Sequence, residues 1–222
     1  MSQSTGRSPA LDDGGSEARA AAIRDAAIRQ EPKHRRLITS PKHGQILSGL
    51  MRPGYTFGSV PSGHAVLSTT GRKTGKPRHK VIRAIRQGDR VYIVQLRPPA
   101  VAVDTPLAVA AWVLNIRADP HVQLKLGRRI CAATMREIED PAELAHAREI
   151  FCEPVHLVDY PECVIHLKGR PSTRKIRDLH RYWFDTGVPL VAELQTRPLG
   201  NPTTAIQPSL QGASHGNRPV NR

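Results

Sequence analysis

The sequence predicts a mainly β (α+β) protein in which short strands form one antiparallel sheet that closes into a barrel, flanked by a few helices. Strand-like segments follow one another with short turns, and few segments of helical length separate them. Gly88 and Asp89 leave room between two of these strands for a tight hairpin turn only, since glycine tolerates a positive φ. The crossover helix that a parallel sheet requires does not fit there.

The strands are expected at six places where β-branched and aliphatic residues are bounded by turn residues. These segments are residues 65–70, 80–86, 90–96, 121–126, 129–135 and 188–194. Between the third and fourth of them, the apolar run 107–116 has helical spacing. A longer helix is expected to end near Cys152 and to begin after Asp140, an N-cap residue followed by Pro141 and Glu143.

The folded unit is expected to cover residues 35–195, with an arm before it and a tail after it. Residues 1–34 are expected to be disordered, because the Ala-rich run 17–29 has helical potential but little apolar surface to bury. Residues 196–222 hold four prolines and no acidic residue. Such a segment does not offset its ordering entropy, so a disordered tail is expected.

The composition restricts which compartment and which class of protein the sequence is compatible with. The 222 residues include 33 Lys and Arg against 19 Asp and Glu, a formal net charge of +14. No stretch approaches the roughly 20 apolar residues of a membrane helix, and the polar N-terminus holds no signal-peptide run. Three cysteines are too few, and too odd in number, for a disulfide framework. A cytoplasmic protein without a membrane span is therefore expected.

The positive charge is concentrated in one loop and the hairpin beside it. Residues 72–97 contain nine Lys and Arg and a single acid, although strand arginines such as Arg83 are equally consistent with a solvated face. The loop reads Thr-Thr-Gly-Arg-Lys-Thr-Gly-Lys-Pro-Arg over 69–78, and its glycines free the backbone so that N–H groups converge on an anion. Its arginines and lysines add charged donors. These features predict an anionic partner, either a nucleotide cofactor or a nucleic-acid backbone.

The same loop, its hairpin and the run 111–122 carry a family resemblance. Between two strands, the 69–78 sequence resembles the loop of the deazaflavin (coenzyme F420)-dependent nitroreductase family of actinobacteria, in the split β-barrel flavin-binding superfamily. The run Ala-Trp-Val-Leu-Asn-Ile, followed by an Asp-Pro turn and a strand, resembles the helix of that family. The resemblance covers about residues 60–195. It implies a split antiparallel β-barrel that transfers hydride from reduced F420 to a quinone, a nitroaromatic or another conjugated acceptor.

The resemblance also implies roles for particular residues. Those matching the family's cofactor-binding positions are Thr70, Gly71, Arg72, Lys73, Thr74, Gly75, Lys76, Pro77, Arg78, Arg97, Trp112 and Asn115. The loop members would hold the phosphate and the acidic glutamyl tail, with the ring near residues 95–98. Arg97-Pro98-Pro99 departs from the Lys-Gly-Gly-like turn that the family often has, and the two prolines offer no backbone N–H. Tyr160 is expected either to face the substrate or to fill the core, and no side chain is expected to be an essential acid or base.

Several alternatives stay open at this level. An FMN-binding split barrel, or a barrel that binds cofactor without turnover, would share the fold, and a basic nucleic-acid-binding module would share the charge. A zinc site at Cys152, His156, Cys163 and His166 is disfavoured, because the spacing matches no compact zinc motif. The aromatic cluster 182–184 within the insertion 156–184 is expected to be core, with a substrate lid as the alternative. The expected barrel is also compatible with a homodimer.

Overall fold

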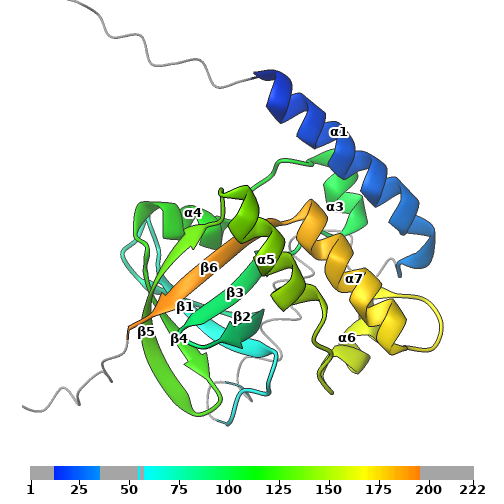
Figure 1. Cartoon of the computed structure of the whole chain (residues 1–222). Coiled ribbons are helices and arrows are strands. Elements are labelled where there is room, and N and C mark those ends of the chain that lie inside the picture. The colour runs from blue at the N-terminus through cyan, green and yellow to red at the C-terminus, as the bar shows by residue number, and fades with distance from the viewer. Residues whose placement is uncertain (1–12, 36–54, 56–57, 196–222) are drawn as a thin grey trace, which may run out of the picture.

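A computed structural model describes residues 13–35, 55 and 58–195 of the chain, and six antiparallel strands in this part close into a barrel (Figure 1). Around the barrel the order is β1-β2-β3-β6-β5-β4. The strands are β1 (His64–Thr70), β2 (Pro77–Gln87), β3 (Arg90–Gln95), β4 (His121–Leu126), β5 (Arg129–Glu137) and β6 (Val188–Leu194). The predicted antiparallel barrel is therefore confirmed.

The observed strands differ from the expected ones mainly in length. β2 begins three residues earlier than the sequence predicts, because Pro77, Arg78 and His79 continue the ladder opposite Thr70, Thr69 and Ser68. β5 likewise continues to Glu137, which pairs with Leu190 of β6. The hairpin at Gly88 forms as predicted, with φ of 62° at that glycine.

The barrel encloses a core of small and branched side chains that alternate along each strand. This core includes Ala65, Leu67, Ile82, Ala84, Val91, Ile93, Val122, Leu124, Met135 and Leu190. The helix α4 (Ala111–Ala118) adds Val113 and Ile116 to the same core. The predicted helix 107–116 therefore begins four residues late, and the sequence did not predict the short helix α3 (Pro99–Asp104).

Three helices, α5 (Pro141–Cys152), α6 (Asp159–His166) and α7 (Thr173–Thr186), pack outside the barrel (Figure 1). The N-cap prediction for α5 is confirmed, since the carboxylate of Asp140 accepts a hydrogen bond from the Glu143 N–H at 2.7 Å. Phe151 of α5 and Phe184 of α7 pack against outward-facing side chains of β2, β3 and β6. Tyr182, Trp183 and Phe184 are all buried, so the aromatic cluster is core rather than lid.

The N-terminal part of the described chain is helical and packed, which differs from the expected disorder. Helix α1 (Asp13–Gln30) continues into the 3₁₀ helix η1 (Glu31–Lys33) and lies beside α3 (Figure 1). Ile23 and Ala27 are buried against Ala102 of α3, and this contact packs the Ala-rich helix onto the rest of the protein. Residues 1–12 and the predicted tail 196–222 lie outside the described residues. None of the helices in the described ranges is long and apolar enough to cross a bilayer.

Candidate cofactor-binding site

The glycine-containing loop between β1 and β2 is closed by its own backbone. The Gly71 N–H donates to the Lys76 carbonyl at 2.9 Å, and the N–H groups of Thr74 and Gly75 donate to the Gly71 carbonyl at 3.0 and 2.7 Å. Gly75 has φ of 64°, which favours glycine. A Cβ on Gly71 would lie 3.0 Å from both the Lys76 carbonyl oxygen and Thr74 Oγ1. The turn therefore favours glycine at 75 for its backbone conformation and at 71 for the close approach of Lys76 and Thr74.

The loop offers an anion its side chains rather than its backbone. Besides the three N–H groups already named, those of Arg72 and Lys76 donate to Asn115 Oδ1 and to Thr74 Oγ1. Most of the backbone N–H groups that were predicted to converge on an anion are therefore hydrogen-bonded within the protein. Pro77 contributes no N–H and instead pairs with Thr70 at the start of β2.

Four cationic side chains remain exposed around the turn: Arg72, Lys73, Lys76 and Arg78. None of them pairs with a carboxylate in the part of the chain that the structure describes. Arg78 Nη2 donates to Thr74 Oγ1 at 3.4 Å, which holds its guanidinium over the turn. This donor set fits an anionic cofactor, because its positive charge is not neutralised within the described protein.

Asp119, which accepts a hydrogen bond from Thr70 of the loop, is also bound by His121. Hydrogen bonds from the His121 backbone N–H, the His121 ring and the Thr70 hydroxyl hold the pKa of Asp119 below its ordinary value. Asp119 Oδ1 lies 3.1 Å from the His121 backbone nitrogen and 3.0 Å from its Nδ1. The hydroxyl of Thr70 therefore has a partner in Asp119, just before β4.

Helix α4 fixes the loop through one amide side chain. Asn115 is buried, and its Oδ1 accepts from the Arg72 backbone nitrogen at 3.2 Å and from Arg72 Nη1 at 3.4 Å. Its Nδ2 donates to Thr69 Oγ1 at 3.3 Å. Arg72 Nη1 also donates to the Ala111 carbonyl at 3.4 Å. The structure thus brings Asn115 and the loop together, with the half-buried Trp112 on the same helix.

Arg97 is not brought to the loop. Its side chain is 3% exposed, donates to the Thr186 carbonyl, and donates from Nη2 to the Ala108 carbonyl at 3.0 Å. Burial lowers its pKa. The position of Arg97 therefore gives no support to the prediction that its charge binds the cofactor. Its side chain instead links the segment before α4 to the end of α7.

Gln95 begins the segment 95–98 near which the ring is expected, but its hydrogen bonds were not predicted from the sequence. Its Nε2 donates to the Ala108 carbonyl at 3.0 Å, and its Oε1 accepts from the Ala110 N–H at 2.8 Å. These bonds hold residues 108–110 out of helical geometry and set where α4 begins. A buried glutamine at a strand end gives no sequence signal of this role, because its partners are backbone groups.

Tyr160 lies at the opposite end of β1 from the loop. It is in the first turn of α6, 36% exposed, with its hydroxyl 3.3 Å from Thr173 Oγ1. The neighbouring Asp159 binds Arg83, whose strand partner His64 is six residues from Thr70. Six residues of strand span about 20 Å. Because Tyr160 is 36% exposed, it does not fill the core. The length of the strand also means that the structure does not bring Tyr160 to the cationic loop.

A buried ionic cluster lies under α6. Arg83 donates to the Asp159 carboxylate, and both side chains are fully buried. Arg83 Nη2 lies 3.2 Å from His180 Nδ1, while Glu162 Oε2 lies 3.9 Å from His64 Nε2. Burial raises the pKa of Glu162 to about 7 and lowers that of His64 to about 4. The solvated face considered for Arg83 is wrong, because its strand position points outward under helices rather than into water.

The residues of the disfavoured zinc site do not form a metal-binding group in the part of the chain that the structure describes. Cys152 packs with Phe151 and Phe184, whereas Cys163 packs in a separate cluster with Trp183. Burial raises the pKa of both thiols, so each stays a neutral thiol.

The fold and the site define an antiparallel β-barrel protein whose first hairpin carries a cationic turn, braced by a helix and suited to an anion. The sequence model of the F420H(2)-dependent quinone reductase family matches residues 47–160, about half of the chain. The chain belongs to this family, which confirms the resemblance seen in the loop and in α4. It is a deazaflavin-dependent oxidoreductase, and its cofactor is coenzyme F420.

Two solved structures to which the chain is similar are each 18% identical to it. One is an F420-H2 dependent reductase (FDR-A), with a TM-score of 0.41 over 61% of this chain and 97% of that chain. Another, described as a domain-swapped dimer, has a TM-score of 0.42 over 69% of this chain and 100% of that chain.

Proposed function

We propose that the β1–β2 loop of this reductase holds the phosphate and glutamyl tail of F420, and that hydride passes from the reduced cofactor to a quinone or another conjugated acceptor. The observation that supports this most is the set of four exposed cations on one turn, locked to α4 by Asn115. Membership of the F420H(2)-dependent quinone reductase family supports a quinone as acceptor.

The residues of this chain bind and orient the cofactor. Arg72 and Arg78 present planar donors to paired anionic oxygens, and Lys73 and Lys76 add charge beside them. When bound, the reduced deazaflavin supplies the hydride. No side chain near the loop is required as an acid or base, so the protein acts by holding two partners in register.

A titration of tryptophan fluorescence with oxidised F420 tests this assignment. Arg72→Ala and Arg78→Ala should each weaken affinity about tenfold, the effect of removing a charge-assisted hydrogen bond. Arg86→Ala is the matched control: it removes an exposed arginine from the other end of β2, where Nε binds the Gly88 carbonyl. If both loop variants bind like the control, the loop assignment is wrong.

The acceptor is tested separately with the parent protein. Reduced F420 is mixed with a benzoquinone, a naphthoquinone or a nitroaromatic, and the return of the oxidised cofactor's visible absorbance is followed. We expect turnover with a quinone. Turnover with the nitroaromatic alone would reject the quinone and leave the cofactor assignment standing.

Two further predictions accompany this proposal. Tyr160→Phe should change turnover with the acceptor and leave F420 affinity unchanged, if Tyr160 faces the substrate as the family resemblance implies. A homodimer is predicted, and sedimentation velocity of the full chain distinguishes it from a monomer.

A further inference from the structure

The exposed side of α6 and the turn just before it carry apolar side chains that nothing in the described structure covers. Leu157, in that turn, is 89% exposed, and in the helix Tyr160 is 36% and Val164 40% exposed. Tyr160 and Val164 are four residues apart and share one side of α6, whereas Asp159 and Cys163 are buried. Large exposed apolar residues elsewhere in the described chain are isolated, such as Ile28, Leu107 and Ile130. A cluster of this kind marks an interaction surface, whereas single ones do not.

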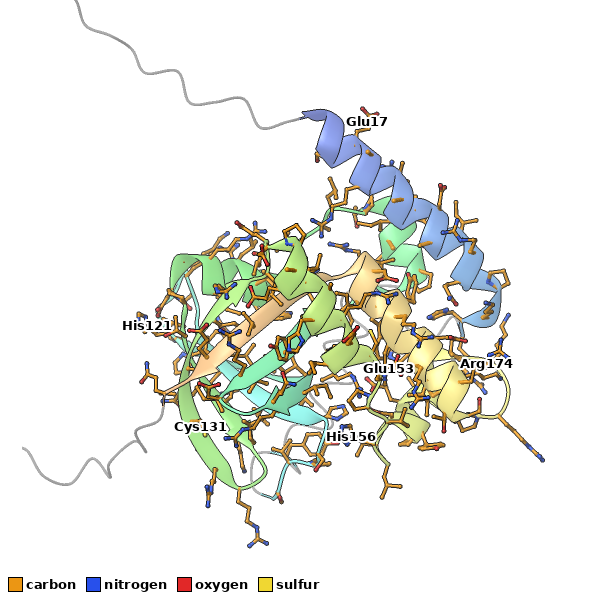
Figure 2. All side chains as sticks on the ribbon, viewed as in Figure 1. Glu17, His121, Cys131, Glu153, His156 and Arg174 are labelled. Carbon is orange, nitrogen blue, oxygen red and sulfur yellow. The ribbon has the colours of Figure 1, made fainter. Side chains whose placement is uncertain are left out.

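Cations border this apolar face. The segment 164–177, which continues from α6 into α7, contains five Lys and Arg and no acid. Arg170 and Arg174 are exposed and make no ion pair among the described residues, and Arg174 lies in the first turn of α7, away from the barrel (Figure 2). The hydrogen-bond contact between Tyr160 and Thr173 places this charged segment next to the apolar side chains.

The charged segment is also held in shape. Lys175 Nζ donates to the carbonyls of Lys168 and Arg170 at 3.2 and 3.1 Å, and Lys168 Nζ donates to the Pro32 carbonyl at 2.9 Å. Bonds to neutral carbonyls leave the charge of both lysines in place. The segment 168–175, a loop that continues into the first turn of α7, therefore holds four positive charges in a fixed conformation next to Tyr160.

We propose that this face, formed by Leu157, Val164, Arg170 and Arg174, docks the protein onto the surface of an anionic lipid bilayer. The apolar side chains would enter the boundary between headgroups and acyl chains, and the arginines would bind lipid phosphates. A nucleic-acid backbone would match the cations but would gain nothing from Leu157 or Val164.

Co-sedimentation of the full chain with vesicles tests the proposal. Vesicles of phosphatidylcholine mixed with phosphatidylglycerol should bind the protein, and vesicles of phosphatidylcholine alone should bind it at least about tenfold more weakly. Leu157→Asp and the double change Arg170→Glu with Arg174→Glu should each reduce binding about tenfold. Ile130→Asp is the matched control, since it charges a side chain that is 56% exposed on β5, and it should bind like the parent.

Each other outcome overturns the proposal. Equal binding to both vesicle types, or an equal loss in Ile130→Asp, rejects specific docking. Loss with the arginine changes but not with Leu157→Asp shows binding by charge alone, as for a nucleic acid. A fall of several degrees in the melting temperature of Leu157→Asp shows that the protein itself covers the face, and conversion of a dimer to a monomer shows that a second copy does. F420 affinity of these variants should match the parent, so a failed cofactor assignment and a failed docking proposal are told apart.

Discussion

At the residue scale, Asn115 is the residue through which α4 acts on the cationic turn. All its described hydrogen bonds go to the protein, to Thr69 and to both the backbone and the guanidinium of Arg72. Asn115→Ala should weaken F420 binding about tenfold, because Arg72 is no longer held in place. The change should raise KM for the cofactor and leave kcat at saturation near the parent value.

A double-mutant cycle decides whether Asn115 acts through Arg72. If it does, Asn115→Ala should add little to the loss already caused by Arg72→Ala, since residues acting through one contact are not additive. Additive losses would contradict this and would mean that Asn115 touches the cofactor itself. Gln123→Ala, at an exposed position of β4, is the control for nonspecific loss.

The buried pair Arg83 and Asp159 predicts a large, one-sided effect on stability. Asp159→Asn should lower the free energy of unfolding by about 3–5 kcal/mol, because the buried Arg83 guanidinium then loses the carboxylate that it binds directly. Asp185→Asn breaks the exposed, two-bond contact with Arg148 and should cost less than about 1 kcal/mol. Urea unfolding curves of the two variants measure the difference, and equal losses would refute the argument.

At the scale of elements, the junction between α7 and β6 depends on Gly187. A Cβ at this position would lie 2.5 Å from the carbonyl oxygens of Gln95 and Trp183 and from Val94 Cγ1. Gly187→Ala should therefore cost at least about 2 kcal/mol in unfolding free energy, because two of these atoms are backbone and do not move aside.

Gly75→Ala is the contrasting variant. Gly75 has φ of 64° and open space around the missing Cβ, so only backbone strain of about 1–2 kcal/mol is expected. Thermal unfolding of both variants compares the two costs. A Gly187→Ala protein that melts at the parent temperature would show that the junction tolerates a side chain.

Local sequence signals predicted elements wherever the physical cause was local. The cap at Asp140 and the turn at Gly88 need only neighbouring residues, and both form as expected. The predicted start of α4 was four residues too early. Gln95, which lies well before the helix in the chain, holds Ala110 through its side chain. The packing of α1 was not predicted, because alanine packs well only against a close partner, and that partner is the distant Ala102.

At the scale of the whole molecule, the barrel topology was predictable and the buried polar cluster was not. Hairpin turns and strand alternation restrict the sheet to antiparallel neighbours, so closure follows from the order of the segments. Arg83 and Asp159 are 76 residues apart, and nothing local in the sequence links them. The same reason explains Arg97, whose charge suggested a ligand while its partners are carbonyls of distant segments.

Buried histidines give the whole molecule a stability that depends on pH. Burial lowers the pKa of His64 and His166 to about 4 and that of His180 to about 2, against 6.5 in the unfolded chain. Unfolding therefore takes up protons between about pH 4 and 6.5, and stability is lost as the pH falls through this range. Glu162, with its pKa raised to about 7, acts in the opposite sense between about 4.5 and 7, but one carboxyl does not offset three histidines.

His166→Phe isolates one of these protons. The His166 ring packs edge-on against Trp183 with centroids 5.0 Å apart, and a phenyl ring keeps that contact without titrating. Between pH 4 and 6.5, the loss of unfolding free energy with falling pH should become shallower by about 1.4 kcal/mol per pH unit, the contribution of one proton. Urea unfolding at several pH values measures the slope, and a reference at about pH 8, where the histidine is neutral in both states, corrects for altered packing. A variant with the parent slope would mean that His166 takes up its proton equally in the folded and unfolded chain, and that its burial against α7 carries no electrostatic cost.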